Sequence, residues 1–143
     1  MRHHDILQTL LVSTHRLGRM AARSTGNPTW SATWAALSVL ETEGPHRIGE
    51  LAAAVRVSQP GMTKIVQNLV VDEWVLRIAD ADDSRAWSIA IAPKGAAALQ
   101  QWRETIAAAI APAFEDLSPD DWRALERAAR VLSSRIERAE VAA

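Results

Sequence analysis

A row of polar side chains on one predicted helix is the strongest candidate for chemistry in this sequence. Between Ser58 and Glu73 the apolar residues recur at helical spacing, at Met62, Ile65, Val66, Leu69 and Val70. One face of this helix is therefore expected to pack into a core. The opposite face then presents Gln59, Pro60, Thr63, Lys64 and Gln67. Amide and ammonium groups in such a row can hydrogen-bond base edges in the major groove of DNA, and threonine or proline can contact a thymine methyl group.

A solvated polar face is the simpler interpretation of this row, because every surface helix has one. The preceding segment favours a binding surface instead. Residues 48–55, with the sequence IGELAAAV, predict a short helix that a turn at Arg56-Val57 joins to the polar helix. Ser58 is a good N-cap, and the free amides of a helix start can hold a phosphate. Two helices joined in this way predict a helix-turn-helix.

A change to a period of two follows the polar helix. Residues 75–78 and 88–91 read as short strands around a polar turn at residues 81–85. A hairpin directly after a helix-turn-helix is a wing, and a plain surface hairpin is the alternative interpretation. Arg85 lies at the tip of this hairpin, among acidic residues.

Long amphipathic helices flank this centre. The first helix ends at Gly26-Asn27-Pro28, and a second, beginning near Thr29 or Ser31, stops at Gly44-Pro45. Another runs from Pro93 to Pro112, and the last begins with a capping-box pattern at Ser118. The last helix carries a seam with coiled-coil spacing, at Trp122, Leu125, Ala129, Leu132 and Ile136. The first helix is likewise expected to bury one broad apolar side.

Composition excludes several classes of function. The 143 residues contain no cysteine, which rules out disulfides and thiolate chemistry. Four histidines without ligand spacing, and no nucleophile-elbow, P-loop or dinucleotide motif, predict no enzyme, no metal and no cofactor. Neither a signal peptide nor a membrane span is predicted, so a cytoplasmic protein is expected. The carboxylates at 80, 82, 83, 120 and 121 fall in predicted turns, where solvation explains them.

The charge balance sets a condition on any nucleic-acid partner. The formal net charge is −1, and residues 46–95 hold six basic and six acidic side chains. Such a neutral segment can bind phosphates only if its basic groups are sorted onto one face.

Residues 48–95 resemble the winged helix-turn-helix of the MarR family of bacterial regulators. The best match is IGELAAAVRVSQPGMTKIVQNL, and Asp83-Ser84-Arg85 is similar to the Asp-x-Arg motif of that family's wing. Ala92-Pro93-Lys94-Gly95 stands where the family begins its long dimerisation helix. The chain departs from the family at Glu73, where a small turn residue, often glycine, is usual, and at Asn68, which replaces a basic residue.

The resemblance implies a mainly α (α+β) fold, in which a winged helix-turn-helix with a two-stranded wing is flanked by N- and C-terminal dimerisation helices. We expect one domain over residues 1–143, with DNA binding in roughly residues 30–95 and dimerisation through residues 1–25 and 96–143. Its expected function is a homodimeric repressor on a pseudo-palindromic site in double-stranded DNA. The alternative is a protein-interaction module on the same scaffold with weak or no DNA binding.

The resemblance also implies roles for single residues. Arg85 would enter the minor groove, where narrow stretches attract arginine, and Asp83 would hold its side chain. Candidate phosphate contacts are Arg47, Arg56 and Arg77. The expected DNA site therefore comprises Ser58, Gln59, Pro60, Thr63, Lys64, Gln67, Arg77, Asp83 and Arg85. A small aromatic or anionic effector is expected near Trp30, Trp34, Trp102, His15 and Arg19, although a core or interface anchor is the simpler interpretation of each tryptophan.

Overall fold

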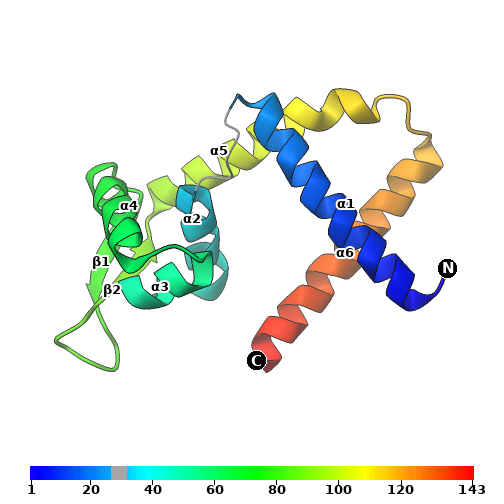
Figure 1. Cartoon of the computed structure of the whole chain (residues 1–143). Helices are drawn as coiled ribbons and strands as arrows, with labels where there is room; N and C mark the ends of the chain where they lie inside the picture. Colours follow the sequence, from blue (N-terminus) through cyan, green and yellow to red (C-terminus); the bar gives the residue numbers. More distant parts are fainter. Residues whose placement is uncertain (27–31) are drawn as a thin grey trace. The chain divides into compact units, whose positions relative to one another are not determined.

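The computed structural model describes residues 1–26 and 32–143, which form two compact units, Met1–Ile110 and Ala111–Ala143. The order of elements in the first unit is α1 (His3–Ser24), α2 (Ala32–Glu43), α3 (Ile48–Val55), α4 (Gln59–Val71), β1 (Val75–Ala79), β2 (Trp87–Ile91) and α5 (Pro93–Ile110) (Figure 1). The second unit holds a 3-10 turn, Ala111–Phe114, and α6 (Pro119–Ala142). This order confirms the predicted winged helix-turn-helix between long helices. The predicted start of the second helix lies outside the described residues, as does Trp30.

The core of the first unit lies among α2, α3, α4, the hairpin and α5. Its largest fully buried side chains are Leu37, Leu40, Leu51, Met62, Val66, Val75, Ile89 and Leu99. The predicted apolar stripe of α4 supplies part of it. Met62, Val66 and Leu69 are buried, and Ile65 and Val70 pack against them. Burial on this side fixes which face of α4 is turned to solvent.

A tight turn joins α3 to α4. Arg56 has the left-handed conformation, with φ of 61°, and its amide donates to the carbonyl oxygen of Ala53. The amide of Val57 donates to Ala52 at 3.0 Å, which completes the end of α3. Ser58 then caps α4, since its Oγ accepts a hydrogen bond from the amide of Gly61 at 3.1 Å. The predicted N-cap is thus confirmed.

The end of α4 explains one departure from the family pattern. Glu73 also has a left-handed backbone, with φ of 63°. Its amide donates to Val70 and the next amide, of Trp74, donates to Leu69 at 2.9 Å, which is a Schellman ending. Glycine adopts this conformation without the cost of about 1 kcal/mol that a side chain brings. The small residue usual at this position is therefore a backbone requirement, which this chain meets with a glutamate.

The wing is a two-stranded antiparallel hairpin whose register runs from Val75↔Ile91 to Ala79↔Trp87. Each strand extends one residue further toward the tip than predicted. An isolated antiparallel bridge at His46, which the sequence did not reveal, pairs this residue with Ile89 through bonds of 3.1 and 2.7 Å. The segment before α3 is thereby joined to the wing.

The start of α5 lies against the end of α4. The amide of Ala92 donates to the carbonyl oxygen of Trp74 at 2.9 Å. A Cβ atom built on Gly95 would lie 2.1 Å from that same oxygen, so only glycine fits here. The Ala92-Pro93-Lys94-Gly95 segment thus holds α5 close to the helix-turn-helix.

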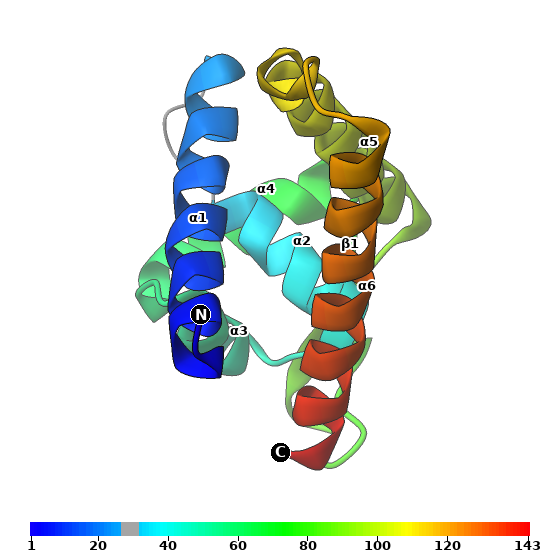
Figure 2. The same ribbon diagram turned by 90° about the vertical axis from the view of Figure 1, so that its right-hand side faces the viewer.

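The terminal helices α1 and α6 are each continuous (Figure 2). Most residues of both helices are exposed. In α1 one residue, Ala21, is buried, whereas Ile6, Leu7, Leu11 and Val12 are exposed. The expected burial of a broad side of this helix is therefore met only in part. In α6 the predicted capping box is confirmed, because Ser118 Oγ accepts from the amide of Asp121 at 3.1 Å. No residue of α6 is buried. Among the described residues, no helix is long and apolar enough to cross a membrane.

Candidate nucleic-acid interface

The outer face of α4 presents the polar row that the sequence predicted. Gln59, Pro60, Lys64 and Gln67 are exposed, while Met62 and Val66 anchor the other side of the helix. Thr63 is half-buried, and its Oγ1 donates to the carbonyl oxygen of Gln59 at 3.0 Å. The Thr63 hydroxyl is therefore hydrogen-bonded within its own helix. The amides of Gln59 and Gln67 and the Lys64 ammonium can still donate to base edges.

The wing carries Arg85 on the loop between β1 and β2, which projects away from the helices (Figure 1). Asp83 accepts a hydrogen bond from the backbone amide of Arg85 at 3.0 Å, through its Oδ1. The Asp83 carboxylate was expected to hold the guanidinium of Arg85. In the structure it instead fixes the backbone of the loop. The guanidinium makes no hydrogen bond or ion pair within the described part of the chain, and it is exposed.

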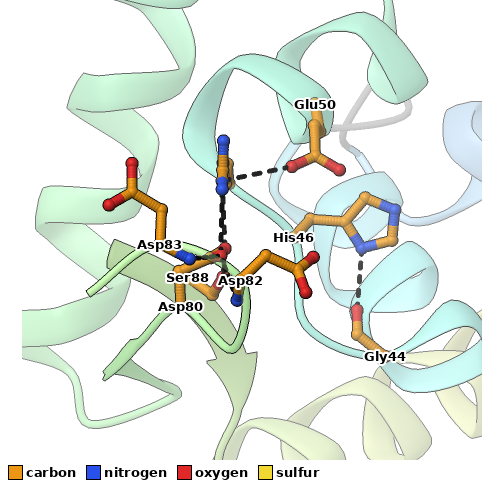
Figure 3. Close-up of polar contacts among 8 residues, drawn as sticks. Gly44, His46, Glu50, Asp80, Asp82, Asp83 and Ser88 are labelled. Atoms are coloured by element: carbon orange, nitrogen blue, oxygen red, sulfur yellow. Dashed lines mark hydrogen bonds and ion pairs between the residues drawn. The ribbon is translucent and has the colours of Figure 1, made fainter. Parts of the chain in front are cut away.

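Asp80 is the most heavily bonded side chain in the wing (Figure 3). The Arg47 guanidinium donates to both of its oxygens, at 3.0 Å from Nε and 2.9 Å from Nη2. Ser88 donates at 2.8 Å, and the amides of Asp82 and Asp83 donate at 2.9 and 3.0 Å. These bonds, the one from Arg47 above all, hold the pKa of Asp80 well below its usual range.

Two expectations change as a result. Solvation does not account for Asp80, because only 10% of its side chain is exposed and each oxygen has protein donors. Arg47 is equally committed to this carboxylate, which raises the pKa of its guanidinium above the usual value. It is therefore not a free phosphate contact. The sequence predicted Asp80 in a turn. The bridge between His46 and Ile89, which brings Arg47 close to Asp80, has no recognisable pattern in the sequence.

The six basic side chains of residues 46–95 differ in whether they form an ion pair, which the formal net charge does not show. Arg47 is bound to Asp80, and Lys94 lies 3.7 Å from the carboxylate of Glu73. The other four basic side chains have no ion pair among the described residues, namely Arg56, Lys64, Arg77 and Arg85. All four are exposed and come from the turn, α4, β1 and the wing loop. These four exposed groups are therefore the basic side chains of this segment that remain available to contact phosphates.

A separate cavity of about 200 Å³ lies between α2 and α5. Its walls include Trp34, Ser38, Leu99, Trp102 and Arg103. The indoles of Trp34 and Trp102 are stacked with centroids 5.1 Å apart, and Trp74, which sequence reasoning did not include, lies 5.5 Å from Trp34. Arg103 is paired with Glu41 at 2.7 Å. Of the expected neighbours, Arg19 instead lines a groove on α1, and His15 lines neither space. No group of potential metal ligands occurs in the described residues.

The fold and the exposed row on α4 define a winged helix-turn-helix protein. The sequence model of the MarR family matches residues 31–87. A curated relative, the uncharacterized HTH-type transcriptional regulator YpoP of Bacillus subtilis, is 34% identical over 68 residues, which are 48% of this chain and 48% of the relative. The chain therefore matches about half the length of that relative.

Solved structures extend the likeness in fold to nearly the whole chain. The transcriptional regulator Tm0710 of Thermotoga maritima has a TM-score of 0.65 and 26% identity, with 95% of this chain and 94% of that one covered. A MarR family protein of Bacillus stearothermophilus has a TM-score of 0.63 and 22% identity over 95% and 98%. The resemblance inferred from the sequence is confirmed as a similarity: residues 31–87 match the MarR family model, and nearly the whole chain shares the fold of a solved transcriptional regulator.

Proposed function

We propose that this protein is a homodimeric, sequence-specific DNA-binding regulator that acts as a repressor on a pseudo-palindromic site. The exposed row on α4, anchored from behind by Met62 and Val66, carries the proposal. It would enter the major groove, while Arg85 on the wing would reach the adjacent minor groove. The free basic groups of Arg56 and Arg77 would contact phosphates. Because its partner is chromosomal DNA, we place the protein in the bacterial cytoplasm.

Dimerisation is the second part of the proposal. Each copy would bind one half-site, and two recognition helices need a separation of about 34 Å to meet successive turns of DNA. Two helices leave large apolar side chains uncovered: Ile6, Leu7, Leu11 and Val12 on α1, and Trp122, Leu125, Val131 and Ile136 on α6. We therefore assign dimerisation to residues 1–25 and 96–143, and DNA binding to roughly residues 30–95.

Release by a small effector is the third part. The cavity beside Trp34 and Trp102 offers flat indole walls, and Ser38 and Arg103 offer polar groups at its edge. These groups suit a small planar aromatic anion, whose carboxylate would compete with Glu41 for the guanidinium of Arg103. Benzoate, with neutral benzamide as its control, can be tested for release of bound DNA and for a change in tryptophan emission.

A protein-interaction module on the same scaffold is the second candidate. The equal numbers of acidic and basic residues in residues 46–95 favour it, because a neutral segment attracts DNA weakly. The two candidates differ in whether purified protein retains DNA at all.

Selection of bound sites from random double-stranded DNA is the experiment that decides. Enrichment of a pseudo-palindrome, followed by a mobility shift that weakens as salt rises, would support the proposal. Arg85→Ala should weaken binding and lower the salt dependence by about one unit. Arg127→Ala, an exposed residue on the side of α6 opposite Leu125 and Ile136, is the matched control and should bind as the parent does. Failure to enrich any site would leave the interaction module in its place.

A further inference from the structure

The Asp80 carboxylate joins three segments that are far apart in sequence. Arg47 precedes α3, Asp80 follows β1, and Ser88 belongs to β2. Arg47 and Asp80 are separated by 33 positions, and Asp80 and Ser88 by 8. The backbone joins the same segments one residue away, where His46 pairs with Ile89. Side chains and backbone together fasten the base of the wing to the start of the helix-turn-helix.

The bonding of this carboxylate is saturated. Its Oδ1 accepts from Arg47 Nη2 and from the amides of Asp82 and Asp83, and its Oδ2 accepts from Arg47 Nε and Ser88 Oγ. An ionised carboxylate has about four acceptor sites, so no capacity is left for a partner outside the protein. The planar fork of Arg47 also fixes the orientation of the carboxylate, which a lysine could not do.

The same bonds continue to the tip of the wing. Asp80 accepts from the amide of Asp83 at 3.0 Å (Figure 3). Asp83 in turn accepts from the amide of Arg85 at 3.0 Å. A connected path therefore runs from the N-terminal end of α3 to the backbone of Arg85. The exposed guanidinium has no other fastening among the described residues.

We infer that Asp80 and Arg47 are positioning residues for DNA binding, which set the place of the Arg85 wing relative to α4. This inference rests on the proposed DNA-binding function. It assigns a role to two residues that make no contact with DNA themselves. A wing freed from this joint would sample many positions, and Arg85 would lose entropy on entering the groove.

Charge and position predict opposite results for one substitution. Asp80→Asn removes a negative charge from a surface that binds phosphates, which by electrostatics alone tightens binding. It also breaks the paired hydrogen bonds with Arg47. If these bonds position the wing, their loss weakens DNA binding. Asp82→Asn is the matched control, because it removes the same charge only two positions from Asp80. The Asp82 carboxylate itself makes no bond to any described residue.

The test measures affinity for the duplex that the parent protein selects from random DNA. We expect Asp80→Asn to weaken binding about tenfold, within the range for residues coupled in one network, and Asp82→Asn to leave it unchanged or tighter. In an Arg85→Ala background, Asp80→Asn should cost less than about twofold, because the residue to be positioned is gone. Tighter binding by Asp80→Asn, or an equal loss in both backgrounds, would overturn the inference.

A second measurement keeps the test sound if Asp80→Asn unfolds. Ser88→Ala removes one of the donors to Asp80 and should show the same dependence on Arg85 at smaller size. Hydrogen exchange of the amides of Asp82, Asp83 and Arg85 should be faster in both variants, whereas exchange in α6 should be unchanged. Unchanged exchange in the wing would count against the joint without any DNA present. Failure of the parent protein to select a duplex would instead remove the proposed function.

Discussion

The winged helix-turn-helix and the terminal helices satisfy their apolar residues in different ways. Around α2, α3 and α4 the large apolar side chains are covered by the same chain, and Leu37, Leu51 and Met62 have no exposed surface. On α6 no residue is buried, and Ile136 keeps 54% of its surface exposed. Both regions have helical apolar periodicity, so the pattern alone does not distinguish a buried core from an exposed apolar face.

This difference has a thermodynamic consequence. Burial of a large aliphatic side chain stabilises a fold by about 1.5–3 kcal/mol. The winged helix-turn-helix gains this within one chain, while the α6 seam would gain it from the second copy in the proposed dimer. Stability of the first region should depend on its own residues, and that of the second on protein concentration.

The largest effect is expected in the core. Leu51→Ala in α3 should lower the free energy of unfolding by about 2–5 kcal/mol, because the side chain is fully buried and leaves a cavity. Leu76→Ala on β1 makes the same change at a side chain that is 51% exposed, and should cost under about 1 kcal/mol. Urea unfolding of both variants measures the difference. Equal losses would contradict the burial seen in this region.

On α6 an exposed leucine, rather than a buried one, is expected to have the larger effect, and the effect is on oligomeric state. Leu125→Glu places a charge on the exposed apolar seam and should shift the proposed dimer to monomer at micromolar concentration, as measured by light scattering. Ser134→Glu adds the same charge on the opposite face of the helix and should leave the dimer intact. A dimeric Leu125→Glu protein would show that the seam is not the partner surface.

Two glycines give a smaller contrast. Gly95→Ala should destabilise by about 1–3 kcal/mol, because its Cβ would collide with the backbone oxygen of Trp74. Gly18→Ala in α1 meets nothing within 4 Å and should stabilise the helix by about 0.5–1 kcal/mol. Thermal unfolding distinguishes the two signs. A stabilising Gly95→Ala would mean that α5 does not lie so close to the end of α4.

The smallest expected effect is a dependence on pH in the wing. The folded-state pKa of Asp80 lies below the ordinary aspartate value of 3.8, so the unfolded chain takes up the proton first as pH falls. Its stabilisation is present above that value and is lost as pH drops toward the folded-state pKa. The charged groups nearby are Arg47, Glu50, Asp82 and Asp83. The stability difference between the parent and Asp80→Asn should therefore shrink below about pH 4. A difference that stays constant down to pH 3 would argue against the ion pair.

Local signals made much of the fold predictable. The helix at residues 48–55 has the predicted bounds, and the caps at Ser58 and Ser118 are present, because capping and periodicity are encoded in adjacent residues. Exposure of Gln59, Lys64 and Gln67 followed directly from the apolar stripe behind them. The roles of these residues toward DNA stay predictions.

Contacts between distant segments could not be predicted in the same way. Asp80 meets Arg47 because His46 forms an isolated bridge with Ile89, and one residue is too short to show a periodicity. Asp83 was expected to hold a side chain but binds the backbone of Arg85, since the conformation of the turn decides which donor comes within reach. Such pairings depend on tertiary geometry that a pattern along the chain does not contain.

The indoles of Trp34, Trp74 and Trp102 form a cluster whose circular dichroism reports on the structure around it. They come from α2, from the segment after α4 and from α5, so a shift of any one of these parts alters the distances between the rings. Rings at 5.1 and 5.5 Å are close enough to couple electronically, and the near-ultraviolet circular dichroism of the cluster will change with those distances. Motion between the long helix and the helix-turn-helix can thus be followed in the unlabelled protein.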